Sequence, residues 1–183
     1  MHIFPFQRTV KKKIRNHNVK SDLAKTGWKF SPSRLKMIQE EEAIWQQYYL
    51  PVDVSNKTVL DIGAGEGETA WFYLKHGAKK VVCVEPEKEA YNRLLGNAVG
   101  KPMEAINRIF RLDDLNLKYD FLKVDIEGYE EALLNVELKK PAIIEVHGLQ
   151  LRDRFKLKNY RILYPTVADA NGMGCICFAY WQC

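Results

Sequence analysis

One glycine-rich segment constrains the fold of this 183-residue chain more than any other. The apolar run over residues 59–62 is typical of a buried parallel strand. Gly63, Gly65 and Gly67 follow it, and glycines at this spacing allow a tight turn whose backbone can approach a ligand closely. Residues 69–76 then favour a helix. The segment predicts a strand, a glycine loop and a helix, with free backbone N–H groups and the positive end of a helix dipole at the loop.

The acids around this loop indicate which ligand it holds. Asp61 precedes the glycines, and Glu68 stands where the G-x-G-x-x-G spacing of a dinucleotide-binding loop requires its last glycine. A carboxylate beside the loop is unfavourable for a pyrophosphate and suits a ligand that carries an amino group. Residues 80–84 predict a second buried strand, and Glu85 follows it at close to the offset of about 20 residues at which an acid meets ribose hydroxyls.

The D-x-G-x-G-x-G loop and the acid after the second strand together resemble motifs I and II of class I S-adenosylmethionine-dependent methyltransferases. The resemblance implies that the loop contacts the methionine part of the cofactor and that Glu85 binds its ribose. It also implies the Rossmann-like α/β fold of this class, a mostly parallel seven-stranded sheet with a C-terminal antiparallel hairpin. The residues predicted to bind the cofactor are Asp61, Gly63, Ala64, Gly65, Gly67, Glu85, Pro86 and Asp125.

Further acids and a histidine lie at the ends of two later predicted strands. Asp125 and Glu127 follow one of them, and the next strand ends with Glu145 and His147. Because open α/β sheets bind ligands at the carboxyl ends of their strands, these side chains should share one crevice. We predict Asp125, Glu127 and His147 as catalytic residues, with His147 or Glu127 as the general base for a hydroxyl acceptor. A divalent ion held by Asp125, Glu127 and Glu145 is also considered, since carboxylates suit Mg²⁺, although the spacing does not establish it.

These later segments carry a closer resemblance, to the FkbM-type methyltransferases. It rests on L-D-D-L at residues 112–115, L-K-V-D-I-E-G-Y-E at 122–130 and I-I-E-V-H at 143–147. Tyr129 stands where that family usually has Ala. The resemblance covers residues 58–148 and implies O-methylation of a small molecule or a sugar hydroxyl.

Two alternatives remain open. Residues 75–81, followed by Glu85-Pro86 and Ala90-Tyr91, also resemble the same stretch of tRNA guanine methyltransferases. An RNA (tRNA or rRNA) methyltransferase that contacts RNA through residues 8–20 is therefore the first alternative, although D-I-E-G follows the fourth predicted strand in place of an N-P-P-Y-type motif. A non-catalytic protein that binds S-adenosylmethionine is the second. The glycine spacing disfavours a nicotinamide-dependent oxidoreductase.

The positive charge of the chain is concentrated near its N-terminus. The formal net charge is +5; residues 1–50 carry a net +6, concentrated around the run at 8–20, and the remaining residues carry −1. We predict a basic N-terminal arm over residues 1–30 and a single methyltransferase domain over 31–183. The run can serve as an RNA contact or simply as a solvated extension, and the second interpretation is favoured because no aromatic platform lies within it.

The composition gives no indication of a membrane or secreted protein. No apolar run approaches the ~20 residues of a membrane span. The first residues lack the apolar core of a signal peptide. Four cysteines are too few for a disulfide framework in a chain of this length. We expect a cytoplasmic protein with reduced thiols, and the sequence does not predict its oligomeric state.

The remaining elements follow from local patterns. Ser31 as N-cap and Pro32 at the first helical position begin a helix well. Two apolar runs near the C-terminus are typical of strands joined by a hairpin-type link. The remaining expected elements are helices over 31–50, 86–95 and 129–136, a strand over 103–110, strands over 159–164 and 175–181, and the link over 169–174.

Overall fold

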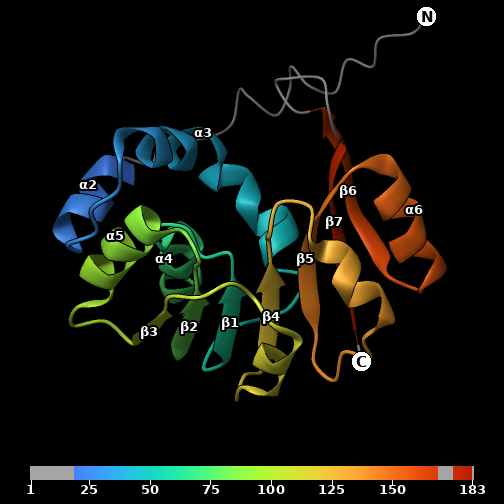
Figure 1. Cartoon of the computed structure of the whole chain (residues 1–183). Helices are drawn as coiled ribbons and strands as arrows, with labels where there is room; N and C mark the ends of the chain where they lie inside the picture. Colours follow the sequence, from blue (N-terminus) through green and yellow to red (C-terminus); the bar gives the residue numbers. More distant parts are fainter. Residues whose placement is uncertain (1–18, 169–174, 183) are drawn as a thin grey trace, which may run out of the picture.

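The fold is known from a computed structural model, which describes residues 19–168 and 175–182. The described residues form a sheet of seven strands in the order β3-β2-β1-β4-β5-β7-β6 (Figure 1). The pairs among β1 to β5 are parallel, whereas β7 runs antiparallel to both β5 and β6. This topology confirms the predicted fold class. The strands are β1 (Thr58–Ile62), β2 (Lys80–Val84), β3 (Met103–Ile106), β4 (Phe121–Val124), β5 (Ala142–His147), β6 (Arg161–Ala168) and β7 (Cys175–Trp181).

Helical segments connect the parallel strands, because a parallel pair needs a crossover rather than a hairpin. Ser31 caps α3 as expected, since its Oγ accepts the backbone N–H of Arg34 at 3.4 Å and Pro32 follows at the first helical position. The helices are α2 (Val19–Lys25), α3 (Pro32–Tyr49), α4 (Glu68–Lys75), α5 (Lys88–Ala98) and α6 (Leu149–Leu157), with the short 3₁₀ helices η1 (Leu112–Asn116) and η2 (Glu130–Asn135).

Apolar side chains cover both faces of the sheet. Because successive residues of a strand point to opposite faces, Val59 packs in one apolar cluster while Leu60 and Ile62 pack in the other. Trp45 of α3 and Phe72 of α4 belong to the first cluster, and their rings meet edge to face at 5.6 Å. The sheet is therefore buried between two layers, and packing on both sides fixes the carboxyl ends of its strands.

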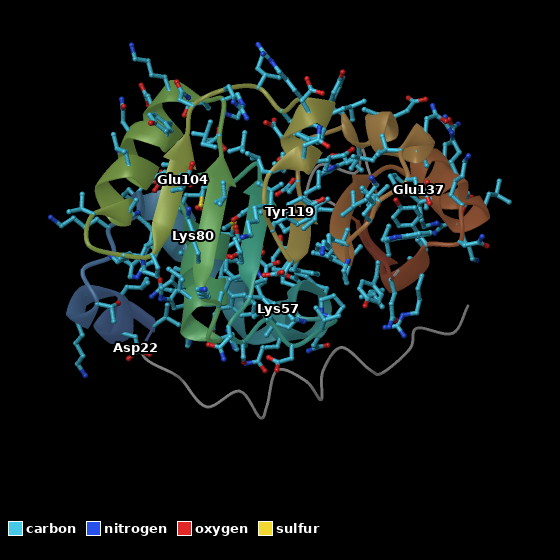
Figure 2. All side chains as sticks on the ribbon, turned by 90° about the horizontal axis from the view of Figure 1, so that it is seen from below. Asp22, Lys57, Lys80, Glu104, Tyr119 and Glu137 are labelled. Carbon is cyan, nitrogen blue, oxygen red and sulfur yellow. The ribbon has the colours of Figure 1, made fainter. Side chains whose placement is uncertain are left out.

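The two ends of the strands differ in what surrounds them. In Figure 1, α3 lies across the carboxyl ends of the central strands. Figure 2 views the opposite end, where Lys57 precedes β1, Lys80 begins β2 and Tyr119 precedes β4. At that end Lys80 forms an ion pair with Glu104 of β3 at 2.6 Å. No helix among the described residues is long and apolar enough to cross a membrane.

Several predicted bounds were wrong. The third strand stops at Ile106 rather than at residue 110, and the helix expected over 129–136 is the six-residue 3₁₀ helix η2. The sequence did not predict α2 or α6. Cys83 is a buried free thiol in β2, as expected. The link over 169–174 and most of the basic run at 8–20 lie outside the described residues.

The predicted basic arm and the predicted domain share one apolar core. Val19 and Leu23 of α2 are buried, and so is Trp28, which follows that helix. All three belong to the same apolar cluster as the buried residues of α3. The described part of the arm, residues 19–30, therefore packs against the domain.

Candidate active site

A cavity of about 550 Å³ lies at the carboxyl ends of the central strands, beneath α3. The glycine loop after β1 forms one part of its lining, through Gly63 and Gly65. The ends of β4 and β5 form another part. Trp45 and Tyr49 of α3 line the opposite side. One hollow therefore joins the predicted cofactor loop to the predicted acid cluster.

The glycine loop makes a turn that only glycine can adopt at its first position. Gly63 has a φ of +73°, and a Cβ built on it would lie 1.7 Å from the carbonyl oxygen of Asp125. The loop therefore packs directly against the backbone that follows β4. This contact holds the ends of β1 and β4 together at the floor of the cavity.

The expectation of free N–H groups in the loop was wrong. The N–H groups of Gly63 and Ala64 both donate to the carbonyl oxygen of Val84, at 2.9 and 3.2 Å. The N–H of Gly65 donates to Glu85 Oε2 at 2.8 Å, and that of Glu66 donates to a carboxylate oxygen of Glu68 at 2.9 Å. Acidic side chains and the end of β2 thus take the place that a pyrophosphate would occupy in a dinucleotide-binding loop.

Glu85 is held firmly at the end of β2. Besides the loop N–H, its carboxylate accepts the backbone N–H of Glu87 at 2.7 Å. Asn107, which follows β3, donates its amide to the carbonyl oxygen of Glu85 at 2.8 Å. Each carboxylate oxygen offers a second lone pair, so Glu85, which lines the cavity, can still accept from a diol. Pro86 comes next in the chain, at the turn toward α5.

Asp61 is placed behind the cavity rather than in its lining. It is fully buried, accepts the hydroxyl of Thr69 at 2.6 Å and lies 3.1 Å from the ammonium of Lys123. Lys123 lines the cavity and also donates to the carbonyl oxygen of Gly63 at 2.9 Å. Burial lowers the pKa of Lys123, but the carboxylates of Asp61 and Asp125 outweigh it and raise that pKa well above its ordinary value. Asp61 therefore stabilises a buried ammonium next to the loop.

The structure brings the acids and the histidine of β4 and β5 together. His147 Nε2 lies 3.7 Å from Glu127 Oε2 and 4.0 Å from Glu145 Oε1. Its other nitrogen, Nδ1, lies 3.0 Å from the fully buried Glu130, which also accepts the backbone N–H of Gly128 at 2.8 Å. The hydrogen bond to Glu130 raises the pKa of His147 to about 9, against a smaller opposing effect of burial.

Glu145 has the environment of a general base at neutral pH, although the sequence prediction did not count it as catalytic. It lines the cavity, and its carboxylate accepts the hydroxyl of Tyr49 of α3 at 2.9 Å. Burial, and then the negative charge of Asp125, raise the pKa of Glu145 to about 7. Glu127 is a weaker candidate because 86% of its side chain is exposed.

The fit of a metal ion to this cluster can be judged from its charges. Among the described residues, the groups whose ligand atoms lie within 4.8 Å of one another are Asp125, Glu127 and His147, so His147 replaces Glu145 in the predicted set. His147 holds its proton at neutral pH and must lose it before Nε2 can bind a metal. The protonated ring already supplies a positive charge to these carboxylates. The spacing of these groups could hold a metal ion, but the charge of the protonated ring opposes one.

Two further charged residues belong to the site and were not predicted from the sequence. Arg34 of α3 lines the cavity and pairs with Glu68 at 3.1 Å. Lys123 is a lysine inside the buried strand β4, and such a residue requires an acidic partner nearby. That signal was present in the sequence, and register supplies the partner, because Asp61 of β1 lies opposite Lys123.

The pairing of His147 predicts a pH dependence of stability. The pKa of His147 in the folded chain, about 9, lies above its ordinary value of 6.5, so its contribution is fully present below pH 6.5 and is lost as the pH rises through about 9. We expect the difference in free energy of unfolding between the wild type and a His147→Gln variant to shrink over this window. Urea unfolding from pH 6 to 10 measures it, and a constant difference would contradict the pairing.

Glu145 acts on stability in a lower and mostly separate pH range. Its folded pKa, about 7, also lies above its ordinary value of 4.5. For a carboxyl group this means that stability falls as the pH rises from 4.5 to 7, because the folded state holds the proton more tightly. Urea unfolding of the wild type and of Glu145→Gln from pH 4 to 8 measures this contribution, and a constant difference in free energy of unfolding over that range would contradict it.

Comparisons of the sequence with known proteins find, among others, two viral relatives whose names give no activity. No model of a protein family matches the chain. "Uncharacterized protein 65" of Sulfolobus islandicus filamentous virus is 31% identical over 108 residues, 56% of this chain and 66% of that protein. "Uncharacterized protein 158B" of Sulfolobus islandicus rod-shaped virus 1 is 29% identical over 138 residues, 69% of this chain and 86% of that protein. The chain thus spans just under two thirds of the first relative and most of the second.

Comparisons of the structure identify the fold. Aeropyrum pernix fibrillarin, with natively bound S-adenosyl-L-methionine, is similar with a TM-score of 0.57, 13% identity and coverage of 77% of this chain and 73% of that one. The precorrin-6y C5,15-methyltransferase of Geobacter metallireducens has a TM-score of 0.56 at 12% identity, covering 79% and 88%. The tRNA m1G37 methyltransferase of M. jannaschii has a TM-score of 0.54 at 16% identity, covering 84% and 50%. The chain therefore has the Rossmann-like fold of the class I S-adenosylmethionine-dependent methyltransferases.

Proposed function

We propose that the chain is an S-adenosylmethionine-dependent methyltransferase that acts on a small molecule. One observation carries the proposal: a single cavity connects the glycine loop and Glu85 to the carboxylates at the ends of β4 and β5. A methyl donor and an acceptor need such a shared, partly enclosed space, because transfer depends on alignment and on the exclusion of water. The fold supports the proposal, since Aeropyrum pernix fibrillarin of the same fold binds this cofactor.

The cofactor would lie along the carboxyl ends of β1 and β2. Glu85 would accept both ribose hydroxyls, and the backbone of Gly63 and Gly65 would face the methionine part, whereas Ala64 and Gly67 do not line the cavity. Pro86 would border the nucleoside beyond Glu85. The contributions of the two acids nearest the methionine part differ. Asp125 lines the cavity and can contact the cofactor directly, whereas Asp61 would act through Lys123.

S-adenosylmethionine supplies an electrophilic methyl group, so the protein has to bind, orient and deprotonate the acceptor. Glu145 would take the acceptor proton near neutral pH, since its pKa is about 7. His147 keeps its proton until about pH 9, which restricts its predicted role as base to alkaline solution. At neutral pH the ring, oriented by Glu130, would instead hold Glu127 and Glu145 in place. Trp45 and Tyr49 would exclude water from above.

The size of the site supports a small acceptor, and the FkbM-type resemblance supports a hydroxyl acceptor. The cavity beneath α3 measures about 550 Å³ and would have to hold the cofactor as well, which leaves little space for the acceptor. O-methylation of a small-molecule or sugar hydroxyl stays a prediction from the sequence.

The test is transfer of an isotopic label from S-adenosylmethionine to members of an acceptor library. We expect incorporation with at least one small acceptor and a large loss of rate in Glu145→Gln at unchanged cofactor affinity. Tight cofactor binding without transfer to any acceptor would favour a non-catalytic cofactor-binding protein instead.

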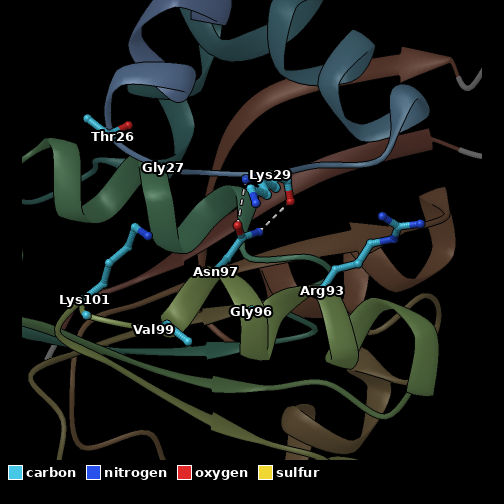
Figure 3. A pocket seen from close by; sticks show the side chains of 9 residues that line it. Thr26, Gly27, Lys29, Arg93, Gly96, Asn97, Val99 and Lys101 are labelled. Carbon is cyan, nitrogen blue, oxygen red and sulfur yellow. Dashed lines mark hydrogen bonds between the residues drawn. The ribbon is translucent and has the colours of Figure 1, made fainter.

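A second hollow favours RNA as the alternative acceptor. It measures about 660 Å³ and lies between residues 26–29 and α5 (Figure 3). Its lining includes Lys29, Arg93 and Lys101 and no acidic residue. Cations in such a groove suit phosphates, and the basic run at 8–20 precedes it in the chain. Salt-dependent tRNA binding that weakens in a Lys29→Glu/Lys101→Glu variant, but not in Lys139→Glu/Lys140→Glu, would support the RNA alternative.

A further inference from the structure

Negative charge exceeds positive charge on the acceptor side of the cavity. Two cations, Lys123 and His147, lie within this part of the site. Ion-pair contacts of 3.0 to 4.0 Å link them to a larger number of acids. Those acids are Asp61, Asp125, Glu127, Glu130 and Glu145.

This excess is partly withdrawn from water. Side-chain exposure is 26% for Asp125 and 14% for Glu145, and both line the cavity. The Oδ1 atom of Asp125 is buried and has no hydrogen-bond partner among the described residues. Burying more acids than cations is costly, so a ligand that brings a positive charge and N–H donors would stabilise this side of the cavity, which is called the acidic wall.

Aromatic rings complete the same wall. Tyr48 of α3 and Phe178 of β7 stack with their centroids 4.0 Å apart, and Tyr49 meets Phe178 edge to face at 5.4 Å. All three rings line the cavity, and Tyr49 also donates its hydroxyl to Glu145. Rings beside carboxylates suit an organic ammonium, through cation–π attraction and apolar contact. A hydrated metal ion gains little from such rings.

The site also offers little to an anionic acceptor. The two cations that line the cavity, Arg34 and Lys123, are paired with Glu68 and Asp61 respectively. A carboxylate or phosphate placed near Glu145 would meet further negative charge. Acceptors of this kind are therefore disfavoured at this wall.

We propose that the methyl acceptor is an amine, bound as its ammonium form between Asp125, Glu145 and the aromatic wall and methylated on nitrogen. The inference rests on the proposed methyltransferase function. The ammonium passes one proton to the Glu145 carboxylate, and the freed nitrogen lone pair forms a bond to the methyl carbon. The carbon–sulfur bond of the sulfonium breaks, its electron pair stays on sulfur, and S-adenosylhomocysteine leaves. The product is an N-methylammonium ion, and Glu145 returns its proton to solvent.

The experiment compares two probes that share a skeleton and differ in one group. Protein saturated with S-adenosylhomocysteine is titrated calorimetrically with 2-phenylethylamine and with 2-phenylethanol. We expect the amine to bind at least tenfold more tightly than the alcohol. The preference should fall severalfold in Glu145→Gln and in Asp125→Asn, and should stay unchanged in Glu137→Gln, which removes an exposed acid outside the cavity.

The outcomes separate this inference from the proposed function. Equal affinities, preference for the alcohol, or no binding of either probe would overturn the amine assignment. If S-adenosylhomocysteine still binds in that case, the proposed methyltransferase function stands. Failure of S-adenosylhomocysteine itself to bind would overturn both. Each titration is repeated with EDTA and with Mg²⁺. Amine binding that disappears with EDTA would show that the carboxylates hold a metal ion, and this result would overturn the inference.

Discussion

Replacing Gly63 with alanine is expected to destabilise the folded chain severely. The new Cβ would lie 1.7 Å from the backbone carbonyl oxygen of Asp125. Neither atom can move away easily, because the sheet holds the backbone at both residues in place. The φ of +73° adds the strain of a left-handed conformation, about 1–2 kcal/mol. Relief of the overlap requires the ends of β1 and β4 to separate. We expect a loss above about 4 kcal/mol in the free energy of unfolding, the range reserved for disrupted cores.

Gly100 provides a matched control for this variant. Its φ is +70°, but nothing lies within 4 Å of a Cβ built there. Gly100→Ala should therefore lose only the conformational contribution, about 1–2 kcal/mol. Urea unfolding of both variants measures the difference. Similar losses in the two would show that the close approach of Gly63 to Asp125 does not exist in solution.

Lys123→Met is expected to destabilise the chain by about 3–5 kcal/mol, because it leaves the fully buried carboxylate of Asp61 without its counter-charge. Methionine fills much of the volume of the lysine stem, so the loss comes mainly from the charge. An Asp61→Asn/Lys123→Met double variant should regain a large part of the loss, since neither buried charge remains. The free energies of unfolding of the single and double variants test this coupling.

Lys80→Met is the corresponding control at an exposed pair. Lys80 contacts Glu104 at 2.6 Å, and its side chain is 43% exposed. Exposed pairs of this kind contribute about 0–1 kcal/mol. Equal effects of Lys80→Met and Lys123→Met, or strictly additive effects in the double variant, would contradict a buried ion pair behind the loop.

Local sequence signals predicted the frame of the fold well. Only a short stretch of chain separates the buried strand before Gly63 from the strand that Glu85 follows. These two strands lie side by side in the sheet, as a βαβ crossover predicts. The same rule placed Asp125 and His147 at one edge of the sheet. These conclusions depended on residue types and spacing within short segments.

Long-range pairing decided the features that the sequence did not reveal. Asp61 lies behind the cavity because register sets it against Lys123, 62 residues away in the chain, and no local pattern fixes that register. Tyr49 reaches Glu145 across a separation of 96 residues, since α3 folds back over the strand ends. Glu85 and Glu68 accept hydrogen bonds from the backbone N–H groups of Gly65 and Glu66, and a glycine motif alone does not indicate these contacts.

The proposed binding of the cofactor is tested most directly by calorimetric titration of the purified protein with S-adenosylmethionine and S-adenosylhomocysteine. Glu85→Ala removes the carboxylate proposed for the ribose, and Glu89→Ala, an exposed acid in the first turn of α5, is its control. The proposed cofactor site predicts dissociation constants on the order of micromolar for the wild type and the control, and at least tenfold weaker binding for Glu85→Ala. Absence of binding by the wild type, or undiminished binding by Glu85→Ala, would contradict it.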